Sequence, residues 1–167
     1  MLFRSEAGSV SKDARELLSS AVADVKAGNL DEAMAALKEL LERDPQNEIA
    51  LGLLAAIWCD LGLVQKGTQG LKELLARDPG NPLARIQLGL TQRADGKPEL
   101  ALATWKQGVE AGDIGALYWS AVVKYENGAA EEALKMLTRA AALTGPAHPL
   151  HQAVQQLLML VESSRRS

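Results

Sequence analysis

Two segments of this chain are nearly identical. Leu37–Asn47 reads LKELLERDPQN, and Leu71–Asn81, which begins 34 residues later, reads LKELLARDPGN, so nine of eleven positions match. A match of this length within one chain indicates an internal repeat. A fixed period of 34 residues is typical of arrays in which pairs of antiparallel helices stack on one another. Such arrays present surfaces to partners, so the period constrains both the fold and the broad class of function.

Three series of residues recur with one phase and indicate four repeats. A glycine series has intervals of 34, 34 and 32 residues. Because glycine accepts the left-handed conformation in which many helices end, each of these glycines is expected to close a helix. One small residue stands five positions after each glycine and another stands seven positions before it, where the two helices of a pair would cross closely. The series are Gly28, Gly62, Gly96 and Gly128; Ala33, Gly67, Ala101 and Ala133; and Ala21, Ala55, Gly89 and Ala121.

The phase of these series predicts where the helices lie. We expect first helices over residues 13–27, 48–61, 82–95 and 114–127, and second helices over 30–43, 64–77, 98–111 and 130–143. Asp44-Pro45 and Asp78-Pro79 end second helices, because a residue before proline avoids helical geometry. Asn81-Pro82 predicts a cap followed by proline in the first turn. After Gly145-Pro146, an apolar stripe at helical spacing predicts a ninth helix over 149–162 that covers the end of the stack.

These boundaries predict one domain over residues 11–162. Its repeats span about 14–47, 48–81, 82–113 and 114–146, so the third repeat is two residues shorter than the first two. We expect a local change in superhelical geometry between the third and fourth repeats. Residues 1–10 carry no periodic pattern, and they and residues 163–167 are expected to be mobile.

Composition narrows the class of protein. The 18 basic and 21 acidic residues give a net charge of −3, which argues against nucleic acid as a partner, since its binders usually carry a basic face. Cys59 is the one cysteine, so no intrachain disulfide can form. The first residues lack the apolar core of a signal peptide, and no apolar run approaches the ~20 residues that span a bilayer. We therefore expect a cytoplasmic protein with no membrane partner.

No pattern of reactive side chains predicts an enzyme. His148 and His151 stand three residues apart, but a zinc site needs three or four protein ligands, and Cys59 lies in another repeat. Asp31-Glu32 and Glu131-Glu132 open second helices, where negative charge complements the helix N-terminus, so we interpret them as caps and not as general acids. The sequence contains no glycine-rich phosphate loop with its lysine. We expect no catalytic residue, no metal and no cofactor.

The repeats resemble the tetratricopeptide repeat (TPR). The matching pattern consists of Leu54-Ala55, Trp58, Gly62, Leu71 and Pro79 in the second repeat, and of Leu88-Gly89, Gly96, Ala101 and Trp105 in the third. The resemblance covers roughly residues 14–145 and implies an all-α fold, a right-handed superhelical α-α solenoid of helical hairpins. Gly67 and Gly70 depart from the pattern, and each weakens the second helix of repeat two by about 1 kcal/mol relative to alanine. Trp58 and Trp105 have the phase of core residues.

In TPR arrays the first helix of each hairpin lines a concave face, and the resemblance implies the same here. These faces are apolar, and a contiguous apolar patch is typical of a binding site. Trp and Tyr dominate interface hot spots, so Tyr118, Trp119 and Tyr125 are the expected anchors. The alternatives are that these side chains pack between repeats, or that the ninth helix folds over the groove. The candidate peptide-binding residues are Leu18, Val22, Ile49, Leu53, Cys59, Leu83, Ile86, Gln87, Leu90, Tyr118, Trp119, Val122 and Tyr125.

The same faces argue against one kind of ligand. TPR co-chaperones that grip an acidic C-terminal tail use Lys, Asn and Arg there, whereas this chain has uncharged residues, namely Leu18, Val22, Leu53, Leu83 and Gln87. The leading hypothesis is a non-enzymatic scaffold or adaptor that binds an amphipathic helix or an extended apolar peptide in the groove. One alternative is a dedicated chaperone for hydrophobic clients, similar to the small TPR chaperones of bacterial type III secretion. The other is a structural protein that forms homo-oligomers through the ends of its stack.

Overall fold

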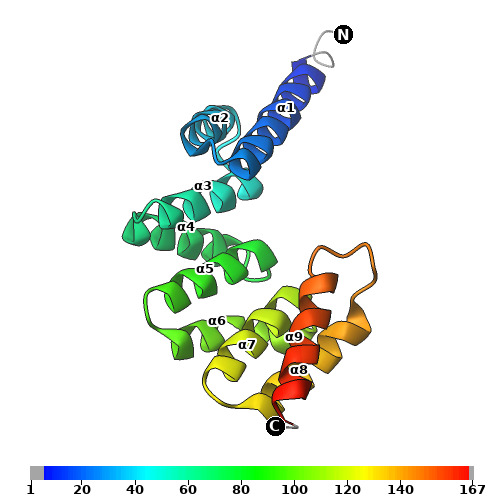
Figure 1. Cartoon of the computed structure of the whole chain (residues 1–167). Coiled ribbons are helices and arrows are strands. Elements are labelled where there is room, and N and C mark those ends of the chain that lie inside the picture. The colour runs from blue at the N-terminus through cyan, green and yellow to red at the C-terminus, as the bar shows by residue number, and fades with distance from the viewer. Residues whose placement is uncertain (1–5, 166–167) are drawn as a thin grey trace. The chain divides into compact units, whose positions relative to one another are not determined.

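The chain folds into helices close to the predicted places. The computed structural model describes the backbone of residues 6–165 and the side chains of residues 13–165. In this part of the chain the helices are α1 (Glu6–Ala27), α2 (Leu30–Arg43), α3 (Glu48–Asp60), α4 (Val64–Arg77), α5 (Pro82–Ala94), α6 (Pro98–Ala111), α7 (Ile114–Glu126), α8 (Ala130–Leu143) and α9 (His151–Ser164) (Figure 1).

The helix map confirms the phase of the repeats. The second helices α2, α4, α6 and α8 have the predicted bounds, and α3, α5 and α7 end one residue earlier than predicted. α1 begins at Glu6, seven residues before its predicted start, and residues 6–12 contain no proline that would prevent a helix there. α9 lies two residues further along the chain than predicted. The mobility of the two ends stays a prediction, and residues 1–5 and 166–167 lie outside the described part.

Three first helices begin at a side-chain cap. The Oδ1 atoms of Asn47, Asn81 and Asp113 accept the backbone N–H of the residue three positions later, at 3.0, 3.0 and 2.7 Å. Such caps satisfy N–H groups that a helix start leaves without an intrahelical partner. Each hairpin turns at the predicted glycine, whose φ lies between +75° and +82° in all four repeats. Since L side chains rarely adopt this conformation, the role assigned to the glycine series is confirmed.

The helices pair as hairpins, which group into two compact units over residues 1–80 and 81–167. In unit 1, α1 pairs with α2, α3 pairs with α4, and α2 packs against α3. In unit 2, α5 pairs with α6 and α7 with α8, while α6 packs against α7 (Figure 1). The terminal helix α9 packs mainly against α8 and also touches α7, so it caps unit 2 as predicted. The single domain over residues 11–162 stays a prediction.

Small residues let the helices of a hairpin approach closely. Ala21 of α1 and Ala33 of α2 are fully buried in one cluster of unit 1. Ala121 of α7 and Ala133 of α8 are equally buried in one cluster of unit 2. Because an alanine side chain is a single methyl group, the backbones can approach to the short end of the usual interhelical distance. Each pair is buried in one cluster, as the prediction requires, and contact of the two residues at the helix crossing stays a prediction.

The hairpin of α3 and α4 is packed more tightly still. A Cβ atom placed on Gly67 of α4 would lie 2.3 Å from the Sγ of Cys59 and 2.6 Å from the carbonyl oxygen of Ala55, both in α3. These distances are far inside van der Waals contact. The absence of a side chain at Gly67 is therefore required by the approach of the two helices, although glycine is a poor helix former.

The two tryptophans assigned to the core differ in burial. Trp105 is fully buried, and its Nε1 donates to the carbonyl of Ile86 at 3.4 Å. A Cβ atom on Gly89 would lie 2.1–2.7 Å from three atoms of the Trp105 indole, so the glycine leaves room for the ring. Trp58 is half-buried against the core of unit 1, and the Nζ of Lys66 lies 4.2 Å from the centre of its ring. The core prediction is confirmed for Trp105, whereas Trp58 lies at the edge of the core.

The shortened third repeat ends in a distinct junction. Gly112 and Asp113 alone join α6 to α7, whereas residues 44–47 join α2 to α3. Gly112 ends α6 in the left-handed conformation, with φ +80°. Arg139 of α8 donates to the carbonyls of Val109 and Glu110, at 2.7 and 3.1 Å, and so satisfies acceptors in the last turn of α6. The change in superhelical geometry expected at this point stays a prediction.

Candidate functional site

Three predicted groove residues of unit 2 converge on one cluster. Ile86 and Leu90 of α5 and Trp119 of α7 are half-buried, and all three pack against the buried core around Trp105 and Ala116. α5 and α7 are first helices of neighbouring repeats, so residues 29 or more positions apart in the sequence form one surface. The other predicted residues on these helices, Leu83, Gln87 and Val122, are also half-buried.

The two tyrosines of α7 belong to a second cluster. Tyr118 and Tyr125 are half-buried and pack around Leu137 of α8 and Val161 of α9. The rings of Tyr118 and Trp119 meet edge to face, with centroids 5.0 Å apart and an interplanar angle of 73°. Each aromatic side chain therefore has both a packed part and an exposed part. The terminal helix contributes to the same cluster as the tyrosines, while the alternative that this helix folds over the groove stays a prediction.

The predicted groove residues of unit 1 differ from one another in exposure. Leu18 and Leu53 pack against the core of unit 1, and Val22 is half-buried. Ile49 is 53% exposed. Cys59 is half-buried, with its Sγ directed at Gly67 of its own hairpin's second helix. A single groove that passes through all four repeats stays a prediction, and within each unit the first helices carry the predicted apolar side chains.

Polar and ionisable groups have mainly local roles. Among residues 13–165, no group of three or more His, Cys, Asp or Glu side chains is placed to hold a metal ion. The Nδ1 of His148 accepts the backbone N–H of Leu150 at 3.1 Å, just before α9 begins, and His151 is half-buried. The predicted acidic pairs lie in the first turns of α2 and α8, beyond the N-cap positions Asn29 and Ala129, so their interpretation as caps is wrong. Within the described part of the chain, no helix combines the length and apolar character that crossing a membrane requires.

An ion pair connects the two helices of the fourth hairpin, α7 and α8. The Nζ of Lys124 and the Oε2 of Glu132 are 2.8 Å apart. The hydrogen bond to Glu132 raises the pKa of Lys124 above its ordinary value of 10.5, although partial desolvation opposes this. The same hydrogen bond, followed by the charge of Lys124, lowers the pKa of Glu132 below its ordinary value of 4.5. Both directions favour the charged pair.

Glu132→Gln is expected to change the pH dependence of stability at its acid end. A lowered carboxyl pKa stabilises the fold above the unfolded value of 4.5, and this stabilisation is lost as the pH falls through the folded value. The raised pKa of Lys124 acts at the opposite end, where stabilisation present below 10.5 is lost as the pH rises. The variant should therefore be slightly less stable than the wild type at neutral pH, and the difference should be smaller at about pH 3.

Urea unfolding at the two pH values measures this difference. Glu162→Gln, which removes an exposed carboxylate from α9, is the matched control and should change neither curve. A deficit of the same size at both pH values would contradict the assignment to Glu132.

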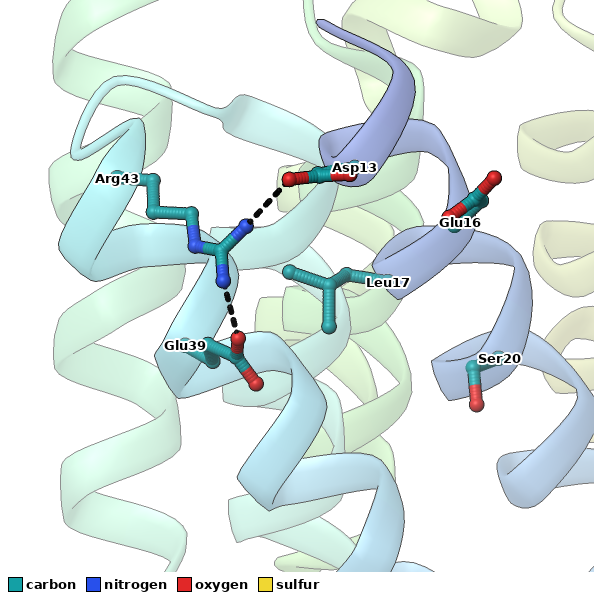
Figure 2. A pocket seen from close by; sticks show the side chains of 6 residues that line it. All are labelled: Asp13, Glu16, Leu17, Ser20, Glu39 and Arg43. Atoms are coloured by element: carbon teal, nitrogen blue, oxygen red, sulfur yellow. Dashed lines mark hydrogen bonds and ion pairs between the residues drawn. The ribbon is translucent and has the colours of Figure 1, made fainter. Parts of the chain in front are cut away.

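The first hairpin carries an open pocket that the sequence patterns did not single out. It has a volume of about 420 Å³ and lies between α1 and α2 (Figure 2). Arg43 of α2 donates to Asp13 of α1 at 3.2 Å and to Glu39 of α2. The available signal was Glu16, because the corresponding position of the other three first helices is alanine (Ala50, Ala84 and Ala116). The lining residues are Asp13, Glu16, Leu17, Ser20, Glu39 and Arg43.

Comparison with known proteins finds similarity in sequence and in fold. The family model described as tetratricopeptide repeat matches residues 24–85. A thermophilic TPR protein of Thermus thermophilus is similar in structure, with a TM-score of 0.73 and 24% identity over 91% of this chain and 82% of that chain. MamA of Desulfovibrio magneticus, from residue 41 to its end, has a TM-score of 0.64 and 18% identity over 92% of this chain and 86% of that chain.

A search of curated protein sequences finds no significant match to this chain. The structural neighbours are less than 25% identical, so they show the fold alone. Sequence and fold agree on the repeat type that the residue pattern resembles, and the helix order fits about four repeats followed by a capping helix. Residues 24–85 therefore match the tetratricopeptide repeat in sequence, and the described chain has the fold of TPR proteins, with about four helical hairpins followed by a capping helix.

Proposed function

We propose that the chain is a non-enzymatic scaffold or adaptor that binds an apolar or amphipathic peptide segment along the faces of its first helices. The observation that carries the proposal is the half-buried surface of unit 2, where Ile86, Leu90 and Trp119 share one cluster. A TPR fold supports protein–protein interaction in general, and this surface is where such an interaction would be strongest.

The packing of the aromatic side chains supports this surface as a binding site. Trp119 packs against the core of unit 2, and its ring also meets the Tyr118 ring edge to face. A side chain fixed in this way loses little conformational entropy when a ligand covers its exposed part. Edge-to-face contact between rings adds to the apolar stabilisation of that arrangement.

The charges near this surface favour an uncharged ligand. Arg93 stands near the end of α5 and Glu126 at the end of α7, and the Nε of Arg93 donates to the Oε2 of Glu126 at 3.2 Å. The pair neutralises both charges at one end of the apolar surface. A peptide that presents an apolar stripe would therefore meet no uncompensated charge there.

Trp119→Ala is expected to weaken binding of the partner by about tenfold or more, because an aromatic anchor of this kind carries much of the energy of an interface. Affinity capture followed by mass spectrometry identifies the partner of the wild type. Titration calorimetry with that partner's segment then compares the wild type with Trp119→Ala and Tyr125→Ala. Circular dichroism shows whether each variant is folded.

Leu100→Ala is the matched control, since Leu100 is 49% exposed on α6, a second helix. This variant should bind as the wild type does. If Trp119→Ala and Tyr125→Ala stay folded and capture the same partners with the same affinity, the first-helix surface is not the binding site. The chaperone and self-assembly alternatives stay predictions.

A further inference from the structure

The open pocket lies on one face of the first hairpin. Comparison of the repeats shows what packs on the corresponding face of other hairpins. Glu16 stands twelve residues before the turn glycine, and the same position holds Ala50 in the second hairpin and Ala116 in the fourth, both fully buried. Ala50 shares a buried cluster with Leu40 of α2. A Cβ atom on Gly108 of α6 would lie 2.8 Å from the Cβ of Ala116. In both hairpins a helix lies on this face.

A basic side chain at this face also holds the end of the covering helix. Arg77 of α4 donates at 3.1 Å to Gln46, which lies just beyond the end of α2. Arg139 of α8 donates to the carbonyls of the last turn of α6. Arg43 stands fifteen residues after its turn glycine, as Arg77 does, but it donates to two carboxylates of its own hairpin. Within the described part of the chain, the side-chain hydrogen bonds of Arg43 therefore stay in the first hairpin and do not reach the end of a third helix.

The corresponding face of the first hairpin is open and acidic. We call it the hairpin-1 face and define it by the six lining residues of the pocket. Figure 2 shows Arg43 between Asp13 and Glu39, with Leu17 between the two helices. Three carboxylates and one guanidinium give this face a formal charge of −2. Glu16 is exposed, so a positive charge can reach it from solvent.

From the repetition and the charge we propose that the hairpin-1 face docks a basic amphipathic α-helix of a partner protein. The helix takes the place that α2 takes on α3 and that α6 takes on α7. Its last turn lies near Arg43, an apolar side chain covers Leu17, and Lys or Arg side chains pair with Glu16 and its neighbouring carboxylates. This surface is distinct from the first-helix faces of unit 2, so the chain could join two proteins.

Two synthetic peptides test the proposal on the full chain. Each has 14 residues, the length of α2 and α6, and the same apolar stripe. One carries lysine and arginine on its polar side, and the other carries glutamate at those positions. Titration calorimetry is expected to show that the basic peptide binds about tenfold more tightly or better, and that added salt reduces the difference.

Glu16→Lys is expected to weaken binding of the basic peptide about tenfold, because it reverses an exposed charge of the face. Glu162→Lys makes the same change of charge at an exposed position of α9 and should leave the affinity unchanged. Circular dichroism establishes that both variants are folded. Equal affinity for the two peptides, or for wild type and Glu16→Lys, would overturn the proposal. Binding of neither peptide would also overturn it, and the face would then be a solvated end of the stack.

Discussion

Replacing Gly89 with alanine is expected to destabilise unit 2 by about 2–3 kcal/mol, although alanine is the better helix former. Helix propensity alone would favour the alanine by about 1 kcal/mol. The added methyl group, however, would lie 2.1–2.7 Å from three atoms of the Trp105 indole. Trp105 is fully buried, so the ring has no free space into which it can move. Urea unfolding of the wild type and the variant measures the loss.

The matched control combines Gly89→Ala with Trp105→Leu. The other three repeats have alanine and leucine at these positions, sixteen residues apart and fully buried, as Ala21 and Leu37, Ala55 and Leu71, and Ala121 and Leu137. The double variant should therefore lie within about 1 kcal/mol of the wild type, whereas Trp105→Leu alone leaves a cavity and should cost more. A double variant no more stable than Gly89→Ala alone would show that the two positions are not coupled.

Gly67→Ala is expected to destabilise unit 1 by about 3 kcal/mol. Helix propensity predicts the opposite sign, since Gly67 weakens α4 relative to alanine. The tertiary contact outweighs this, because the new methyl would lie 2.3 Å from the Sγ of Cys59 and 2.6 Å from the carbonyl oxygen of Ala55. The carbonyl belongs to the backbone of α3, so α3 and α4 have to move apart. Urea unfolding with circular dichroism detection measures the effect.

Two further variants separate the side-chain clash from the backbone clash. Adding Cys59→Ala to Gly67→Ala removes the sulfur but leaves the carbonyl of Ala55, so stability should recover only in part. Gly70→Ala is the matched control in the same helix, because its Cβ would lie 3.3 Å from the Cβ of Ala55 and 3.8 Å from the Trp58 ring. It should be close to neutral. Full recovery in the double variant would mean that the backbone contact does not limit the approach of the helices.

Helix bounds could be predicted because their causes lie within a few residues. The turn glycines, the caps at Asn47, Asn81 and Asp113, and the proline exits act through local backbone geometry. The two terminal helices were predicted less well. α1 begins before the first residue of the first repeat, and α9 begins just after a turn in which the Nδ1 of His148 accepts the backbone N–H of Leu150. Both departures fall where the 34-residue period no longer applies.

The candidate site could be predicted only in outline. Periodicity placed Ile86, Leu90 and Trp119 on first helices, and the structure brings them to one cluster. It did not show that Tyr118 and Tyr125 pack with α9, or that Cys59 is directed at Gly67. Each of these contacts depends on which side chain of another helix packs against the residue. A helical period shows on which face of its own helix a residue lies, but it does not identify the residue on the neighbouring helix.

The near-identical segments Leu37–Asn47 and Leu71–Asn81 separate what the sequence determines from what the tertiary structure decides. The sequence by itself determined the period, the hairpin and the order of the helices, because a repeated segment forms the same local interactions wherever it occurs. The tertiary structure alone decided which glycines cannot be replaced, which aromatic side chains keep an exposed part, and why Arg43 and Arg77 have different partners. The physical reason is that burial and pairing depend on the helix that packs against each face, and that helix differs from one repeat to the next.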